Sequence, residues 1–105
     1  MIASCYDGDT CTTTTGERVR LACIDTPELV GMRAEPVPAK AARDFLRNLV
    51  VGKKVRIRRI TEDRYGRTVA ELFIGTRNVQ RELVASGHAE IYWRHQDQCP
   101  WTEGR

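Results

Sequence analysis

The stretch RLACIDTPE, residues 20–28, begins like a β-strand and ends in a charged turn that contains a proline. Side chains alternate between two faces over residues 19–24, which is the period of a strand. One face carries Val19, Leu21 and Cys23, and the other carries Arg20, Ala22 and Ile24. We therefore expect a strand over residues 19–24 that stops at Asp25-Thr26-Pro27, with charged groups gathered at its end.

Two more strands are expected before this stretch, and a helix after it. Residues 2–6 and 10–15 are rich in Thr, Cys and Ile, and the turn residues Asp7-Gly8-Asp9 separate them. The run AKAARDFLRNLVVG, residues 39–52, repeats apolar side chains with helical spacing. Pro38 lies near its start and Gly52 follows its end, as is usual for a helix. The apolar positions are Ala42, Phe45, Leu46, Leu49 and Val50.

The second half of the chain predicts a hairpin and a shorter helix. KVRIRRI (residues 54–60) and TVAELFIG (68–75) read as strands joined by TEDRYGR (61–67). Asn78 caps a helix that Gly87 ends, and residues 96–105 are expected to be irregular and frayed. The order of elements predicts one mainly β domain with helices (α+β) over residues 1–105, built as a closed or nearly closed five-stranded barrel with two helices and a short tail.

Composition limits the classes of function. The chain has 105 residues, of which 41% are hydrophobic and 30% charged, and its formal net charge is +3. No apolar run approaches the roughly 20 residues that a membrane-spanning helix needs, so we expect a soluble protein that does not act in a membrane. No signal-peptide pattern opens the chain, and the compartment is left open. The small positive charge fits a polyanionic partner without identifying one.

Four cysteines leave two interpretations open. Cys5, Cys11, Cys23 and Cys99 can form two disulfides in three connectivities, which would be typical of a secreted or periplasmic protein, or can remain free thiols. Cys11 and Cys23 lie in apolar, strand-like surroundings, whereas Cys5 and Cys99 are expected to be more exposed. A zinc site is not expected, because the chain has no C-x-x-C pair and no finger-like His spacing.

Three aspartates are candidate metal ligands. Asp7 and Asp9 lie in a turn between two predicted strands, and Asp25 lies at the end of a third, so a barrel could bring them to one rim. Carboxylate and carbonyl oxygens are the ligands that calcium prefers. Without a cation, such close carboxylates repel one another. The alternative is that Asp-Gly-Asp-Thr serves only as a turn.

The residues after Asp25 suit a metal site with an activated water. Pro27 forces Thr26 toward an extended conformation and lacks an N–H, so the Thr26 carbonyl can point at a ligand. Glu28 follows, where a carboxylate beside a metal can act as a general base on water. The alternative is that Thr-Pro-Glu is a surface turn or helix cap.

Two arginines are candidates for binding a phosphate. Arg20 interrupts the strand that leads to Asp25, and Arg67 follows the glycine of the predicted hairpin. A guanidinium offers a planar fork of donors that matches phosphate oxygens. The alternative for each arginine is a surface ion pair.

Three motifs together resemble the thermonuclease, or staphylococcal-nuclease-like, family. They are DGDT (7–10), RLACIDTPE (20–28) and DRYGRTVAE (63–71), with a predicted helix between the second and the third, and the resemblance extends over residues 2–93. It implies an OB-fold barrel and calcium-dependent hydrolysis of phosphodiester bonds in DNA and RNA with little sequence preference. The implied roles are calcium binding by Asp9, Asp25 and the Thr26 carbonyl with Asp7 in support, water activation by Glu28, phosphate binding by Arg20 and Arg67, and a substrate contact by Tyr65.

The chain departs from the family pattern in two places. Where the family carries base-stacking tyrosines after the second helix, this chain reads Tyr92-Trp93-Arg94-His95, and Trp93 is the candidate for stacking on a base. The family's third helix is not expected before Arg105, which raises the alternative of a fragment of low stability. A non-catalytic nucleic-acid-binding module is a further alternative. We expect a monomer that takes single-stranded or frayed DNA and RNA.

Overall fold

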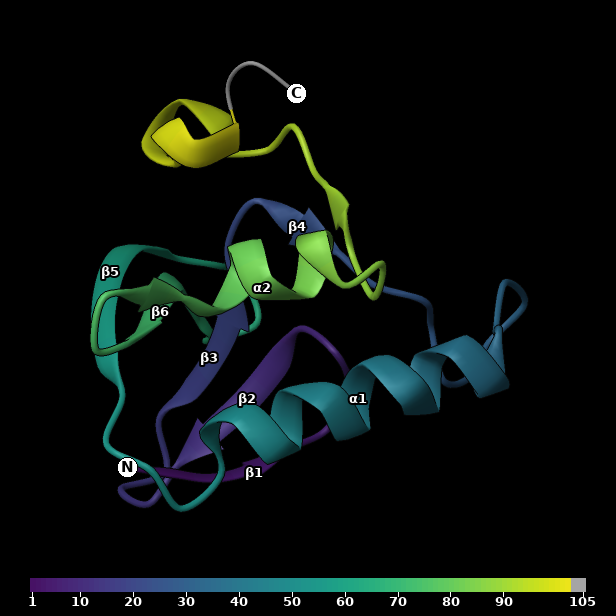
Figure 1. Ribbon diagram of the computed structural model, residues 1–105, viewed down its shortest axis with the longest axis horizontal. Helices are drawn as coiled ribbons and strands as arrows, with labels where there is room; N and C mark the ends of the chain where they lie inside the picture. The colour runs from purple at the N-terminus through teal and green to yellow at the C-terminus, as the bar shows by residue number, and fades with distance from the viewer. Residues whose placement is uncertain (103–105) are drawn as a thin grey trace.

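The computed structural model describes residues 1–102 and has an α+β architecture, as the sequence predicts. Two α-helices and a mixed sheet make up most of these residues (Figure 1). The elements in chain order are β1 (Ile2–Cys5), β2 (Thr10–Thr13), β3 (Arg18–Leu21), β4 (Ile24–Asp25), α1 (Pro36–Val50), β5 (Arg56–Glu62), β6 (Thr68–Ile74), β7 (Arg77–Asn78), α2 (Val79–Ala85), β8 (Glu90–Ile91) and two 3-10 turns (Gln96–Gln98 and Pro100–Thr102).

The main sheet has the strand order β1-β2-β3-β6-β5, and β7 pairs with β6. All neighbours are antiparallel except β3 and β6, which run parallel. β4 and β8 form a separate two-stranded sheet. Near the edges of the main sheet, an isolated parallel bridge joins Ile2 to Val51, in the segment that leads to β5. Closure of this sheet into a five-stranded barrel stays a prediction.

The strand expected over residues 19–24 is broken, and this part of the prediction is wrong. β3 ends at Leu21, and the chain turns at Ala22 and Cys23 before β4 begins. Cys23 has a positive φ of 69°, a left-handed conformation that few residues other than glycine adopt. The fully buried Gln80 stabilises the turn, because its amide donates to the carbonyls of Ala22 (3.2 Å) and Ala70 (2.9 Å). The break redirects the chain so that Asp25 pairs with β8 rather than continuing β3.

Both predicted helices are confirmed. α1 buries Ala39, Ala42, Leu46 and Val50, and it packs against β1 and α2 (Figure 1). It begins at Pro36, earlier than the apolar repeat indicated, because proline is favoured in the first turn of a helix. Asn78 caps α2 by accepting a hydrogen bond from the Arg81 N–H at 3.0 Å.

The apolar core lies between the sheet and the two helices. Strand residues that alternate inward meet the buried faces of α1 and α2, which is how a half-buried sheet and an amphipathic helix normally pack. The large, fully buried aliphatic side chains of this core are Ile2, Val19, Leu21, Ile24, Leu46, Val50, Leu72, Val79 and Leu83. A smaller hydrophobic cluster joins the C-terminal segment to the sheet, and its buried residues are Ala22, Cys23, Val69 and Cys99.

Four cysteines form two disulfides, Cys5–Cys11 and Cys23–Cys99, which settles the open question of their pairing. Cys5 and Cys99 are 1% and 0% exposed, so the expectation that these two are more accessible is wrong. Cys5 and Cys11 face each other directly across the β1–β2 pair. Within residues 1–102, no helix combines the length and apolar character needed to cross a bilayer.

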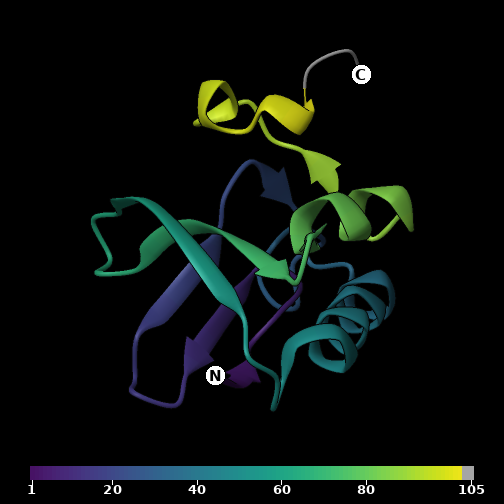
Figure 2. The same ribbon diagram turned by 60° about the vertical axis from the view of Figure 1, so that its left-hand side comes forward.

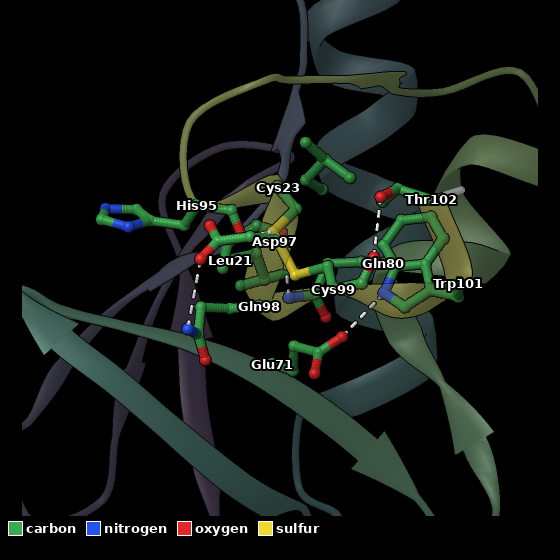
Figure 3. Close-up of a disulfide and its surroundings, with 12 residues drawn as sticks. Leu21, Cys23, Glu71, Gln80, His95, Asp97, Gln98, Cys99, Trp101 and Thr102 are labelled. Carbon is green, nitrogen blue, oxygen red and sulfur yellow. Dashed lines mark hydrogen bonds between the residues drawn. A yellow bond between two sulfur atoms is a disulfide. The ribbon is translucent and has the colours of Figure 1, made fainter. Parts of the chain in front are cut away.

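The C-terminal segment is ordered up to Thr102, contrary to the expectation of a frayed, irregular end. Its two 3-10 turns lie together across the β4 end of the molecule (Figure 2). Thr102 is 1% exposed, and the Trp101 indole donates to the buried Glu71 at 2.7 Å. The Cys23–Cys99 disulfide ties this segment to the turn after β3 (Figure 3). The part of the prediction that concerns residues 103–105 lies outside the described residues.

Candidate active site

The Asp7–Asp9 turn is packed closely against α1 and against Thr26. A Cβ atom on Gly8 would lie 2.8 Å from the Ala42 Cβ and 3.0 Å from the Thr26 Cβ, so only glycine fits. Gly8 does not have a positive φ, so close approach rather than backbone conformation requires glycine here. The Asp7 carboxylate accepts a hydrogen bond from the Asp9 N–H at 3.1 Å and holds the turn in shape.

Asp9 is a buried carboxylate, with only 7% of the residue exposed. Burial raises its pKa to about 6, an effect that Arg20 opposes and the charge of Asp7 reinforces. Its oxygens accept hydrogen bonds from the hydroxyls of Thr10 (3.1 Å) and Thr26 (3.1 Å). A carboxylate so poorly solvated favours a nearby cation, because a positive charge offsets the cost of its ionisation.

Arg20 joins two of the three aspartates that the sequence predicts to lie together, Asp9 and Asp25. Its guanidinium lies 3.5 Å from an Asp9 oxygen and 4.0 Å from an Asp25 oxygen. It also donates to the carbonyls of Leu21 (2.5 Å) and Ile24 (3.0 Å), which fixes it against the turn between β3 and β4. Asp9 and Asp25 therefore approach the same guanidinium from two different elements. The Asp25 side chain is 65% exposed, so it faces solvent while Asp9 does not.

The donor atoms near Asp9 are of the chemical kind that calcium prefers. Carboxylates of Asp9 and Asp25 and the carbonyl of Thr26 are hard oxygen donors, and calcium completes its coordination with water where protein ligands are few. The Thr26 hydroxyl bonds to Asp9, so this residue lies beside the buried carboxylate. Within residues 1–102, no group of three or more His, Cys, Asp or Glu side chains is arranged to hold a metal. A site here would rely on two carboxylates, a carbonyl and water.

Glu28 and the arginines face two different hollows. Glu28 lines a hollow of about 330 Å³ together with Asp25 and Thr26, which we call the Glu28 hollow. Arg20 and Arg67 line a second one of about 530 Å³, which we call the arginine hollow. The contact between Arg20 and Asp25 connects the walls of the two. The other residues of the Glu28 hollow are Pro27, Arg33, Glu35, Gly87, His88, Ala89 and Glu90.

Arg67 is positioned by the hairpin between β5 and β6. Its side chain donates to the Asp63 carboxylate at 2.7 Å, and the backbone N–H groups of Arg67 and Tyr65 donate to the other Asp63 oxygen. Burial raises the pKa of Asp63, but these hydrogen bonds outweigh it and hold the pKa below the ordinary value. Tyr65 lies beside Arg67, whose guanidinium is 5.5 Å from the ring centre. Tyr65 also lines the arginine hollow.

The sequence interpretation missed three residues that line the arginine hollow, Tyr92, Arg94 and His95. The sequence pattern marks them only as a departure from the family, and they lie in the segment that the Cys23–Cys99 disulfide closes. Trp93, the candidate for base stacking, is 67% exposed and is not among the residues that line this hollow. Arg94 lies over the Trp93 ring at 5.5 Å. The remaining residues of the hollow are Leu21, Ala22, Cys23, Thr61, Glu62, Asp63, Arg64 and Val69.

Comparison with known protein families gives a match over most of the chain. Residues 18–103 match the family model described as staphylococcal nuclease homologue. The chain belongs to this family. Membership confirms the resemblance carried by the three motifs and implies an OB-like fold. The DGDT motif at residues 7–10 precedes the matched region, whereas both arginines and Glu28 lie within it.

Individual relatives of the staphylococcal nuclease homologue family carry nuclease names. The chain is 38% identical over 90 residues to an uncharacterized endonuclease of Haemophilus influenzae, a match that covers 82% of this chain and 48% of that protein. It is 36% identical over 75 residues to a staphylococcal-like nuclease of Arabidopsis thaliana, covering 71% and 22%. A probable endonuclease of Komagataella phaffii is 34% identical over 80 residues, covering 70% and 35%. The chain thus spans less than half the length of these curated relatives.

Proposed function

We propose that this domain is a calcium-dependent endonuclease that hydrolyses phosphodiester bonds in DNA and RNA with little sequence preference. One observation carries the proposal: Arg20 contacts both Asp9 and Asp25 and also lines a hollow with Arg67. In this proposal the two carboxylates bind the cation and the two arginines bind the phosphate beside it. Family membership and the nuclease names of the relatives support the same activity.

In this proposal Asp9, Asp25 and the Thr26 carbonyl hold the calcium ion, and Asp7 supports them by fixing the Asp9 backbone. A bound calcium ion supplies positive charge that polarises a phosphate oxygen. The Thr10 and Thr26 hydroxyls keep the Asp9 oxygens oriented. Because Asp9 is buried, its charge is poorly screened by water, which strengthens its interaction with a cation.

Glu28 acts as the general base in the proposed reaction. It takes a proton from the attacking water in the Glu28 hollow, which Asp25 and Thr26 also line. Arg20 and Arg67 donate to the phosphate oxygens, whose negative charge grows during the attack. One preorganised donor of this kind is typically worth about 10²–10³ in rate. Arg67 exchanges part of its pairing with Asp63 for the phosphate, and Tyr65 contacts a neighbouring phosphate.

The proposed substrate is single-stranded or frayed nucleic acid, bound by a monomer. The contacts are to phosphates, which carry no sequence information, and an unpaired base can stack on the exposed Trp93 ring. The proposed architecture is an OB-fold barrel closed along β1 and β5, with the active site at one rim. Two disulfides favour function in an oxidising compartment.

A cleavage assay tests the proposal. The wild type is incubated with a labelled single-stranded oligonucleotide in calcium and in excess chelator, and Glu28→Gln is assayed in calcium. We expect cutting by the wild type in calcium only, and a rate for Glu28→Gln lower by about 10² or more. Undiminished cutting in chelator would refute the calcium role. Binding of the oligonucleotide by the wild type in calcium without cutting would instead identify a non-catalytic nucleic-acid-binding module.

A further inference from the structure

One residue, Cys23, holds both ends of the segment 92–99. The Cys23 carbonyl accepts a hydrogen bond from the Tyr92 N–H at 2.8 Å, and its sulfur is bonded to Cys99. Residues 92–99 therefore form a loop that is closed on Cys23, and we call this segment the closed loop. The disulfide lies at the base of the loop, and the His95 imidazole points away from the sulfur bridge (Figure 3).

Two residues of unusual backbone conformation lie in the closed loop and at its anchor, Cys23. In the part of the chain that the structure describes, only Cys23 (φ 69°) and His95 (φ 61°) are non-glycine residues with a positive φ. Such conformations persist where surrounding contacts impose them, and they are common at ligand-binding sites. Both strained residues also line the arginine hollow. The strain therefore coincides with the wall of the proposed substrate site.

The closed loop adds a positive charge to that wall, the guanidinium of Arg94. Arg94 and Tyr92 line the hollow together with His95 and face the same space as Arg20 and Arg67. Among residues 1–102, no Asp or Glu side chain forms an ion pair with Arg94. Arg67, by contrast, is paired with Asp63. Arg94 is thus available to an anion without first giving up a carboxylate partner.

The rest of the C-terminal segment is anchored outside the hollow. Arg58 donates to the Gln98 carbonyl, and the Trp101 indole donates to Glu71. Arg58 holds Gln98 at the end of the closed loop, and Trp101 holds the residues beyond Cys99. The carbonyls of Trp93 and His95, by contrast, accept hydrogen bonds from N–H groups of the closed loop itself, and the His95 carbonyl lies 3.1 Å from the Cys23 sulfur. Loss of the disulfide would therefore free the residues that line the hollow more than it would free the end of the segment.

We propose that the Cys23–Cys99 disulfide is a positioning element for substrate, which holds the closed loop so that Arg94 and His95 contact a phosphate of the bound strand next to the scissile one. The inference rests on the proposed nuclease function and adds a phosphate subsite to it. Holding these side chains in place before binding removes the cost of ordering them when the strand binds. The disulfide thereby increases affinity for the substrate, in addition to any contribution to stability.

The test uses Glu28→Gln protein in calcium, so that a labelled single-stranded oligonucleotide can bind without being cut. Its Kd is measured by fluorescence anisotropy at several salt concentrations, with and without Cys23→Ser/Cys99→Ser. We expect the Kd to rise about tenfold, which corresponds to about 1.4 kcal/mol. The slope of log Kd against log salt should fall by about 0.7 for each phosphate of a single strand that the variant no longer neutralises.

Two matched arginine variants separate a contact made by the closed loop from the general loss of one positive charge. Arg94→Gln, with the disulfide intact, should lower the salt slope by a similar amount. Arg77→Gln removes an equal charge from β7, where Arg77 is paired with Glu82 and does not line the hollow, and should leave the slope unchanged. Calcium affinity, measured on the cysteine variant by calorimetry, should also be unchanged. A weakened calcium affinity would mean that the disulfide acts through Asp25, which would overturn the inference.

Three further results would overturn the proposed role of the disulfide or of the phosphate subsite. A cysteine variant that melts at a lower temperature but keeps its Kd and salt slope, measured while folded, would show a purely structural disulfide. If that variant does not fold, Arg94→Gln/His95→Gln decides, because unchanged binding by this disulfide-intact protein overturns the subsite. Failure of the Glu28→Gln protein to bind the oligonucleotide, together with failure of the wild type to cut it, would refute the nuclease function and the subsite that depends on it.

Discussion

Replacement of Gly8 by alanine is expected to damage the calcium site through packing alone. The added Cβ would lie 2.8 Å from the Ala42 Cβ, whereas ordinary contact begins at 3.4 Å, so the turn and α1 must separate by about 0.6 Å. Overpacking of this kind typically costs about 1–3 kcal/mol of unfolding free energy. The same Cβ would meet Thr26, whose hydroxyl bonds to Asp9 and whose carbonyl is a proposed ligand. Binding sites need their ligands held to within about 0.5 Å, so we expect the calcium Kd to rise about tenfold or more.

Calorimetric titration of calcium measures this effect, and urea unfolding measures the stability. Gly16→Ala is the matched control, because Gly16 has a φ of +91° and no neighbouring atom within 4 Å. Alanine there costs about 1–2 kcal/mol through backbone strain, and the calcium Kd should be unchanged. In Gly8→Ala/Ala42→Gly, removal of the nearest clashing atom should restore part of the calcium affinity. A Gly8→Ala protein that binds calcium as tightly as the wild type would show that close packing at Gly8 does not position the calcium ligands.

Three further predictions concern pH, stability and catalysis. Because burial raises the pKa of Asp9 from 3.8 to about 6, protons compete with calcium for its carboxylate. The calcium Kd should therefore rise about tenfold per pH unit below 6. A calcium Kd that stays constant between pH 7 and 5 would contradict this prediction. Glu71→Ala should lower the free energy of unfolding in urea by about 3 kcal/mol, since Glu71 is buried and accepts hydrogen bonds from Arg58, Asn78 and Trp101. Glu82 is more exposed, and Glu82→Ala should lower it by less than about 1 kcal/mol. Equal losses in the two variants would contradict the importance of burial at Glu71. Arg67→Gln should reduce kcat by about 10²–10³ in a cleavage assay, and an unchanged kcat would remove Arg67 from the proposed mechanism.

Local patterns were sufficient to predict most elements of this fold. The apolar spacing of α1 and the Asn78 cap of α2 are properties of neighbouring residues, and both helices form as expected. The hairpin between β5 and β6 also follows from a local signal, the Asp-Arg-Tyr-Gly turn between two strand-like runs. In the site, the expected strand topology brings Asp7, Asp9 and Asp25 to one rim, and in the structure Arg20 contacts Asp9 and Asp25.

What the sequence left open depends on contacts between distant residues. Alternation alone continues β3 to Ile24. The turn at Ala22 and Cys23 is instead held by contacts with distant residues, the Cys23–Cys99 disulfide and the buried Gln80 amide among them. Sequence spacing allows three pairings of four cysteines, so the anchoring of the C-terminal segment could not be deduced from it. The closed loop was missed for the same reason, because Cys23 and Cys99, which close it, are 76 residues apart in the sequence.

The proposed calcium site, in which Asp9 and Asp25 hold the ion beside Arg20 and Arg67, can be tested by one kinetic measurement. The rate of cleavage of a single-stranded oligonucleotide is measured against calcium concentration for the wild type and for Asp9→Asn. We expect calcium-saturable cutting by the wild type. For Asp9→Asn, we expect either no cutting or a calcium requirement higher by about 10² or more, since a buried charged ligand has been replaced by a neutral one. Cutting by Asp9→Asn with the same calcium dependence as the wild type would show that Asp9 is not a calcium ligand.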